Sequence, residues 1–133
     1  MKDFLEVLRT ANLNRVVRWH PEGTSCWSVM EWACAMAGEA GEACNVAKKI
    51  KRAQDGVVGK HATTSELADE LADTLIYMDL LAASQGIDLR RAVIRKFNAV
   101  SVREGMPDRL KYDPQLDGCP ECGSRHPPDG MCI

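Results

Sequence analysis

Apolar residues recur at helical spacing along four segments of the chain. In the first segment they are Phe4, Leu5, Leu8, Leu13, Val16 and Val17. Intervals of three and four residues place side chains on one face of an α-helix. Pro21 and Gly23 end this segment, because neither residue continues a helix well.

Three further helices are predicted, at about 25–52, 65–85 and 88–105. Ser65 and Asp88 are the expected N-caps of the last two, because their side-chain oxygens accept from free backbone N–H groups. Gly86 separates these two helices, and glycines 56 and 59 mark the loop after the second. The pattern therefore predicts four helices in series.

The composition favours an all-α fold. Of the 133 residues 45% are hydrophobic but only 5% are aromatic, and strands are typically rich in aromatic and β-branched residues. The length suits one domain with its own core. After Leu116 the sequence turns to Gly, Pro, Cys and polar residues. We therefore expect a helical domain over residues 1–116 and a short Cys/His tail over 117–133.

The net charge and the lengths of the apolar segments limit which kinds of partner the chain is expected to bind. The formal net charge is −2, so no overall field draws the chain to nucleic acid or to an anionic membrane, and neither is an expected partner. The N-terminus lacks the apolar core of a signal peptide, and no later run is long enough to span a membrane. We expect a cytoplasmic protein. Its six cysteines are then thiols or metal ligands, and Cys26, Cys34 and Cys44 are expected to be small buried side chains.

Two carboxylate pairs stand in apolar sequence on the second and third predicted helices: Glu39 with Glu42, and Glu70 with Asp73. Residues three apart share a helix face. Like charges at this spacing destabilise each other unless a cation or a base relieves them. The alternative is a solvated charged surface, which is where such spacing usually occurs. Brought together, the two pairs would supply the oxygen ligands that Mg²⁺ prefers.

Helical-wheel positions, at about 100° per residue, connect each pair with neighbours. The sector of the first pair also contains Glu31 and Lys49, and the stripe of the second pair also contains Glu66 and Tyr77. Glu66 with Asp69 offers the same spacing one turn earlier, but Asp69 lies off this stripe. The later register, Glu70 with Asp73, is preferred.

Three stretches containing these residues resemble the MazG-like all-α nucleoside triphosphate pyrophosphohydrolases: AGEAGEACNVAKKIKR, ELADELADTLIYMDLLAASQGIDL and RKFNAVSVREGMPDRL. The family motif is E-x-x-E on one helix and E-x-x-D on the next, matched by Glu39, Glu42, Glu70 and Asp73. The resemblance covers residues 25–110. It implies a four-helix fold assembled as a homodimer or homotetramer. It also implies Mg²⁺-dependent cleavage of a nucleoside triphosphate between its α and β phosphates, with release of monophosphate and pyrophosphate.

The expected chemistry gives further residues a role. Four carboxylates suit two or more Mg²⁺ ions, for which Mn²⁺ is a possible substitute, and Glu42 or Glu39 could accept a proton from the attacking water. Cations that could neutralise the phosphates are Lys49, Lys96 and Arg103. The alternative for these three is an ordinary solvated base.

Aromatic residues suggest where a nucleobase would stack. Relatives often place an aromatic at the position of Tyr77, with further contacts from the segment that contains His20 and Trp27. Asn98 matches a position that members of the resembled family use near the nucleotide. For Trp27, as for Trp19 and Trp32, a core position is the stronger expectation.

The tail contains a second metal-binding pattern. Its members are Cys119, Cys122, His126 and Cys132. Cys and His at such short separations can bind one Zn²⁺ tetrahedrally, and the pattern resembles a zinc knuckle whose His is displaced by one position. The alternatives are free thiols in a disordered tail. A competing function is therefore a helical interaction module whose zinc knuckle binds nucleic acid or a protein partner.

Overall fold

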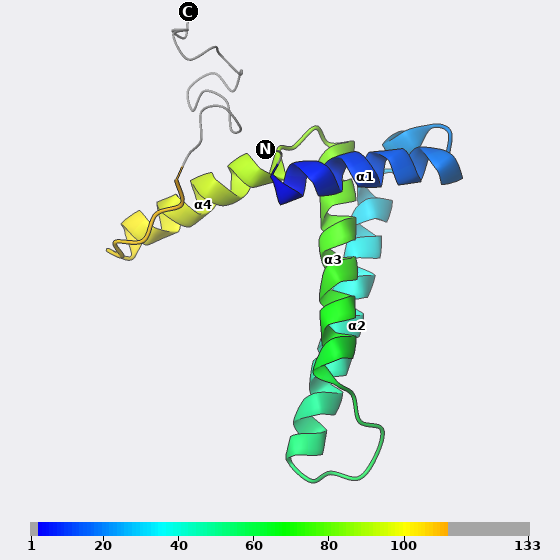
Figure 1. Cartoon of the computed structure of the whole chain (residues 1–133), viewed down its shortest axis with the longest axis vertical. Coiled ribbons are helices and arrows are strands. Elements are labelled where there is room, and N and C mark those ends of the chain that lie inside the picture. The colour runs from blue at the N-terminus through cyan, green and yellow to red at the C-terminus, as the bar shows by residue number, and fades with distance from the viewer. Residues whose placement is uncertain (1–2, 112–133) are drawn as a thin grey trace, which may run out of the picture. The chain divides into compact units, whose positions relative to one another are not determined.

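The computed structural model describes residues 3–111 of the chain, and throughout this part the regular structure is helical (Figure 1). The elements are α1 (Phe4–Trp19), the short 3₁₀ helix η1 (Gly23–Cys26), α2 (Val29–Gln54), α3 (Thr64–Ser84) and α4 (Leu89–Arg103). The all-α prediction is confirmed for these residues. The predicted tail, 117–133, lies outside them. None of the described helices is long and apolar enough to cross a membrane.

Helix α2 begins later than predicted because a capping box sets its start. Ser28 is the N-cap: its hydroxyl accepts from the backbone N–H of Glu31, while the Glu31 carboxylate accepts from the Ser28 N–H at 2.7 Å. The preceding residues form η1. The sequence S-x-x-E at this point contained the signal.

Helix α3 begins with the same device. Thr63 is the N-cap and is paired reciprocally with Glu66, whose carboxylate accepts from the Thr63 N–H at 2.7 Å. The prediction of Ser65 as the cap was therefore wrong by two residues. Ser65 stands next to Glu66, whereas a capping box needs its acid three residues after the cap.

The chain divides into two compact units, described separately here. The larger is Leu8–Gly86, and the smaller combines Met1–Val7 with Ile87–Ile133, of which residues 3–7 and 87–111 are described. In the smaller unit Asp88 caps α4, as predicted, by accepting from the Arg91 N–H at 3.1 Å. Arg90 forms an ion pair with Asp3 at 2.8 Å.

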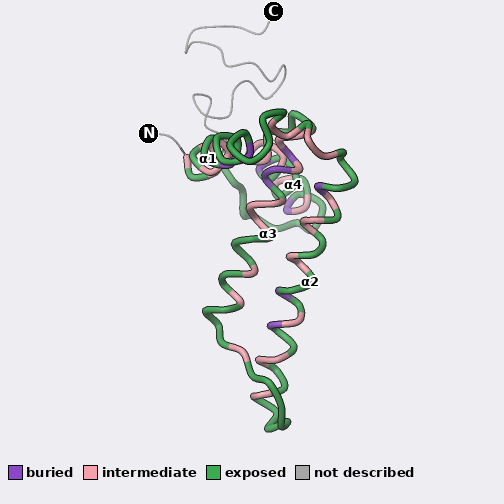
Figure 2. Tube along the Cα trace, turned by 90° about the vertical axis from the view of Figure 1, so that its right-hand side faces the viewer, coloured by how far each residue is buried: buried purple, intermediate pink, exposed green. Residues whose placement is uncertain are grey.

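In the larger unit α2 and α3 run side by side along their length as an antiparallel hairpin (Figure 1). Burial is concentrated toward one end of this hairpin, and much of the rest of the pair is exposed (Figure 2). The buried core there consists of Val16 from α1, Trp32 from α2 and Leu80 from α3. A helix pair without further layers leaves long stretches of its side chains in solvent.

Helix α1 buries little of its predicted apolar face. Of the six residues that define the pattern only Val16 is buried, and Phe4 is 65% exposed. Trp19 was expected in the core but is 66% exposed, with the Arg15 guanidinium 5.3 Å from its ring centroid. The spacing therefore predicted the helix correctly but not its buried side.

Two of the three cysteines expected to be buried lie on the surface. Cys34 and Cys44 on α2 are exposed free thiols, and only Cys26 is half-buried, against the core. Small residues on a long helix pair can face solvent as easily as the partner helix, so their size alone did not determine burial.

Candidate functional site

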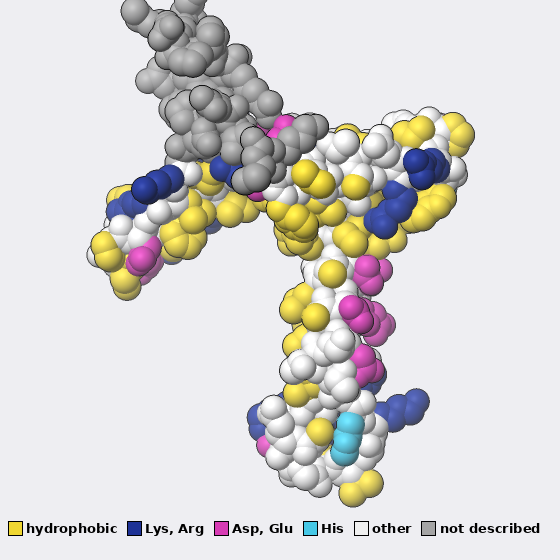
Figure 3. All heavy atoms as spheres, viewed as in Figure 1, with side chains coloured by type: hydrophobic (Ala, Val, Ile, Leu, Met, Phe, Trp, Pro, Cys, Tyr) yellow, Lys and Arg dark blue, Asp and Glu magenta, His cyan; other side chains and the backbone are white. Residues whose placement is uncertain are grey.

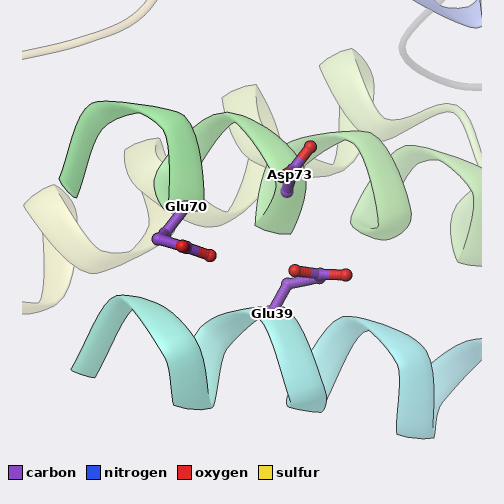
Figure 4. Close-up of side chains that lie close together, drawn as sticks. All are labelled: Glu39, Glu70 and Asp73. Atoms are coloured by element: carbon purple, nitrogen blue, oxygen red, sulfur yellow. The ribbon is translucent and has the colours of Figure 1, made fainter. Parts of the chain in front are cut away.

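Three of the four predicted metal-binding acids come together between α2 and α3. Glu39 from α2 faces Glu70 and Asp73 on α3, and one carboxylate oxygen of each lies within 4.8 Å of the other two (Figure 4). Glu39 and Glu70 are half-buried, and Asp73 is exposed. Acidic side chains follow one another along one side of this helix pair (Figure 3).

The helices position the carboxylates through their spacing. Glu70 and Asp73 are three residues apart, so they project from one face of α3 on successive turns. The antiparallel pairing places Glu39 opposite them. Ala43 and Val46, one and two turns after Glu39 on α2, are buried.

The concentration of negative charge changes the titration of Glu70. Partial burial, followed by the charges of Glu42, Glu39, Asp73 and Asp69, raises the pKa of this carboxyl above its ordinary value of 4.5. The fourth predicted ligand, Glu42, is exposed and acts on Glu70 through its charge. A cation bound among these groups would relieve their mutual repulsion.

Glu31 and Glu66, which share the helical sectors of the two pairs, serve different purposes. Hydrogen bonds from the backbone and then the hydroxyl of Ser28 hold the pKa of Glu31 below its ordinary value, and Thr63 does the same for Glu66. Both carboxylates are thus engaged in caps. This engagement favours the later register, Glu70 with Asp73, over Glu66 with Asp69.

Lys49 lies toward the loop end of the hairpin. It is half-buried, and its charge further lowers the pKa of Glu66. Attraction to a neighbouring carboxylate favours the ionised acid. A positive side chain is therefore present one helical turn before Glu70 in the direction of the loop.

The three predicted stacking residues, His20, Trp27 and Tyr77, form a row with the buried Trp32 at the other end of the hairpin. Ring centroids are 6.4 Å apart for His20 and Trp27, 4.6 Å for Trp27 and Trp32, and 6.4 Å for Trp32 and Tyr77. Tyr77 and Trp27 are half-buried against the core, and His20 is exposed. Tyr77 follows Asp73 by one helical turn, so the last member of this aromatic row, His20–Trp27–Trp32–Tyr77, shares a face of α3 with that carboxylate.

The remaining predicted residues belong to the smaller unit or to the tail. Lys96 is exposed, and Arg103 pairs with Glu104 at 2.7 Å. Asn98 makes two hydrogen bonds with the backbone of Leu110, donating to its carbonyl at 3.0 Å and accepting from its N–H at 2.8 Å. A substrate role for these three stays a prediction. So does zinc binding by Cys119, Cys122, His126 and Cys132, which lie outside the described residues.

A buried polar group was missed by the sequence reasoning. Asp79 on α3 is 1% exposed and is held by Arg9 and Asn12 of α1. The partners are about seventy residues apart in the chain, so helical spacing could not connect them. An acid flanked by apolar residues, in MDLLA, was the available signal.

Comparison with known proteins adds no family, since no family model, no curated protein and no solved structure matches this chain. The geometry of the site and the sequence motif are therefore the basis on which a function is inferred.

Proposed function

We propose that the chain is a nucleoside triphosphate pyrophosphohydrolase, which uses Mg²⁺ to hydrolyse its substrate between the α and β phosphates and releases monophosphate and pyrophosphate. The observation that supports this proposal most strongly is the meeting of Glu39, Glu70 and Asp73 across two helices, within 4.8 Å. The order of these acids along the chain is that of the MazG-like motif. Such enzymes are hydrolases of phosphoric anhydrides.

The donor set fits Mg²⁺, with Mn²⁺ as a substitute. All three groups are carboxylates, the hard oxygen ligands that both ions accept. Partial burial and then the charges of the neighbouring acids raise the pKa of Glu70, and a bound cation would favour its ionised form. Exposed Asp73 can change rotamer to complete the coordination.

The acids have two tasks in this proposal. Glu39, Glu70 and Asp73 would hold the cations, and Glu42, exposed beside them, or Glu39 would accept the proton of the attacking water. Bound Mg²⁺ would neutralise phosphate charge and lower the pKa of a coordinated water. The carboxylate cluster would thus both bind the metal and promote proton transfer.

The substrate's two ends would contact different parts of the chain. Tyr77, with Trp27 and His20 beyond it, offers ring faces on which a nucleobase can stack. Lys49 lies on the opposite side of the carboxylates, where it can neutralise phosphate charge.

We also propose that the protein works in the cytoplasm as a homodimer or homotetramer. Exposed apolar side chains on the helix hairpin support the assembly: Val29, Met30, Leu71 and Met78. Contiguous exposed apolar surface often marks a contact with another chain, and Leu71 and Met78 lie two turns apart on one face of α3. The proposed Zn²⁺ site in the tail would add a second, structural metal.

The proposal is tested by pyrophosphate release with substitutions that keep side-chain size. Glu39→Gln and Asp73→Asn should each reduce kcat/KM at least about a hundredfold, since each removes a charge from the metal site. Asp55→Asn is the matched control, because Asp55 is an exposed acid paired with Lys51 near the hairpin loop, and it should retain wild-type activity. Normal turnover by Glu39→Gln or Asp73→Asn would refute the assignment.

A further inference from the structure

Asp79 is the most deeply buried large side chain among the described residues, at 1% exposure. It lies on α3, six residues beyond Asp73, which places the two acids on different faces of the helix. A carboxylate out of water is unfavourable unless it is paired and hydrogen-bonded. The side chains that pair with Asp79 therefore indicate its structural role.

Both partners come from one face of α1. Arg9 Nε donates to Asp79 Oδ1 at 2.8 Å, and Asn12 Nδ2 donates to Asp79 Oδ2 at 2.9 Å. Arg9 and Asn12 are three residues apart, so they project together. Asn12 is itself 2% exposed, and its Oδ1 accepts from Arg15 Nη2 at 3.2 Å. Both carboxylate oxygens of Asp79 are satisfied.

We name these three residues, Arg9, Asn12 and Asp79, the polar clamp. Val16 is the one buried apolar residue of α1, and Asn12 Nδ2 also donates to the Ile76 carbonyl of α3 at 3.4 Å. Apolar contacts tolerate sliding, whereas a buried pair with two directed hydrogen bonds does not. The clamp therefore sets both the position and the rotation of α1.

The position of α1 determines that of the aromatic row. Val16, one turn after Asn12, packs with Trp32 and Leu80. Helix α1 ends at Trp19, and His20 and Trp27 follow in the next segment of the chain. The ring centroid of Trp27 lies 4.6 Å from that of Trp32. Trp32 in turn lies beside Tyr77. A shift of α1 would move the outer members of the row relative to Tyr77.

We propose that Asp79 is a positioning residue, which acts through the polar clamp to hold the aromatic row in place beside the carboxylates. In the proposed function His20, Trp27 and Tyr77 of this row bind the nucleobase, so this inference rests on that function for its kinetic consequence. Asp79 touches neither the metal ligands nor the substrate. Its loss should weaken nucleotide binding without changing the chemical step.

The first test substitutes Asp79→Asn. The amide offers one acceptor and one donor where α1 presents two donors, so one contact becomes a repulsion. KM should rise about tenfold, in line with the loss of one ordered stacking contact, while kcat stays within about threefold. Mg²⁺ affinity, measured by calorimetry, should be unchanged. A fall in kcat at unchanged KM, or wild-type kinetics, would overturn the proposal.

Arg9→Gln is the second variant, in case Asp79→Asn does not fold. The Arg9 side chain is 25% exposed, so its replacement leaves a less buried defect. It should show the same rise in KM, and Arg9→Lys, which restores the charge, should recover part of it. Asp55→Asn, removing an exposed paired acid, is the control and should match wild type. A loss of kcat in Arg9→Gln equal to its change in KM would indicate a general structural role and refute positioning.

Tryptophan spectroscopy tests the clamp independently of catalysis. If no nucleotide is hydrolysed by the wild type, the proposed function fails, yet the near-ultraviolet circular dichroism of the aromatic row still reports its order. Asp79→Asn or Arg9→Gln should reduce this signal and increase acrylamide quenching of the tryptophans. Wild-type signals in both folded variants would refute the clamp's role in positioning the row.

Discussion

Glu70 is partly buried and has four acidic neighbours, and both features raise the pKa of its carboxyl. Its raised pKa means that the native state keeps a proton that the unfolded chain has already released. Between the ordinary value of 4.5 and the raised value, the stability of the metal-free protein therefore falls as the pH rises. Repulsion between Glu70 and its acidic neighbours destabilises the metal-free fold, and a bound cation would remove this destabilisation.

Replacement of Glu70 by Gln tests whether the charge of this side chain destabilises the metal-free protein. Without metal and above the raised pKa of Glu70, Glu70→Gln should be more stable than wild type. The amide carries no charge, so it neither suffers the desolvation of a buried charge nor repels the neighbouring acids. Mg²⁺ should raise the melting temperature of wild type more than that of the variant. The control is Glu104→Gln, whose carboxylate is exposed and paired with Arg103. Identical pH–stability curves for wild type and Glu70→Gln would contradict the account.

The choice of register can be tested with two aspartates on the same helix. Asp73 has an oxygen within 4.8 Å of Glu39 and Glu70, whereas Asp69 acts on Glu70 through charge alone in the interactions described. Asp73→Asn should weaken Mn²⁺ binding at least about tenfold, and Asp69→Asn should do so much less. Titration followed by electron paramagnetic resonance measures both. A larger loss in Asp69→Asn would favour the earlier register.

At the scale of elements, two capping boxes determine where the hairpin helices begin. Thr63 and Glu66 satisfy each other's backbone N–H groups at the start of α3. Thr63→Ala should lower the free energy of unfolding by about 1 kcal/mol, measured by urea denaturation. Ser65→Ala, two residues along, is the control and should have a much smaller effect. The reverse order would restore Ser65 as the cap.

The pH dependence of this cap follows from Glu66. Its pKa is lowered in the fold, first by the hydrogen bond from the Thr63 backbone. Its contribution to stability is therefore fully present above the ordinary value of 4.5 and is lost as the pH falls through the lower folded value. The stability difference between wild type and Thr63→Ala should accordingly shrink in acid.

Sequence patterns predicted the helices better than their buried sides. Periodic apolar residues and glycine stops identified all four helices, because these signals are local. The side of α1 that meets α3 could not be predicted, since it is defined by Asn12 and by Arg9 reaching Asp79 across some seventy residues. Trp19 was placed wrongly for the same reason: its exposure depends on where α1 lies, which the clamp decides.

The candidate site was partly predictable for a related reason. Glu70 and Asp73 share a face through spacing alone, but their approach to Glu39 depends on the pairing of two helices. The sequence could suggest that pairing only through resemblance to a family. Glu31 and Glu66 fell in the same sectors yet serve as caps, which helical-wheel arithmetic cannot distinguish from ligands.

For the whole molecule, the exposed apolar surface of the hairpin predicts self-association. Leu71 and Met30 are 55% and 68% exposed on adjacent helices. Light scattering after size exclusion should give two or four times the 14.7 kDa chain mass. Leu71→Glu should lower this mass by placing charge in an apolar contact, while Val58→Glu, at a loop residue that is 93% exposed, should not. A monomer at all concentrations would contradict the assembly.

The proposed reaction breaks the bond between the α and β phosphates of a nucleoside triphosphate. The most direct measurement incubates the full chain with Mg²⁺ and a panel of ribo- and deoxynucleoside triphosphates, and identifies the products by anion-exchange chromatography. The account predicts monophosphate and pyrophosphate in equal amounts from at least one nucleotide, with no product when Mg²⁺ is chelated. Diphosphate with orthophosphate, or no product from any nucleotide, would contradict it.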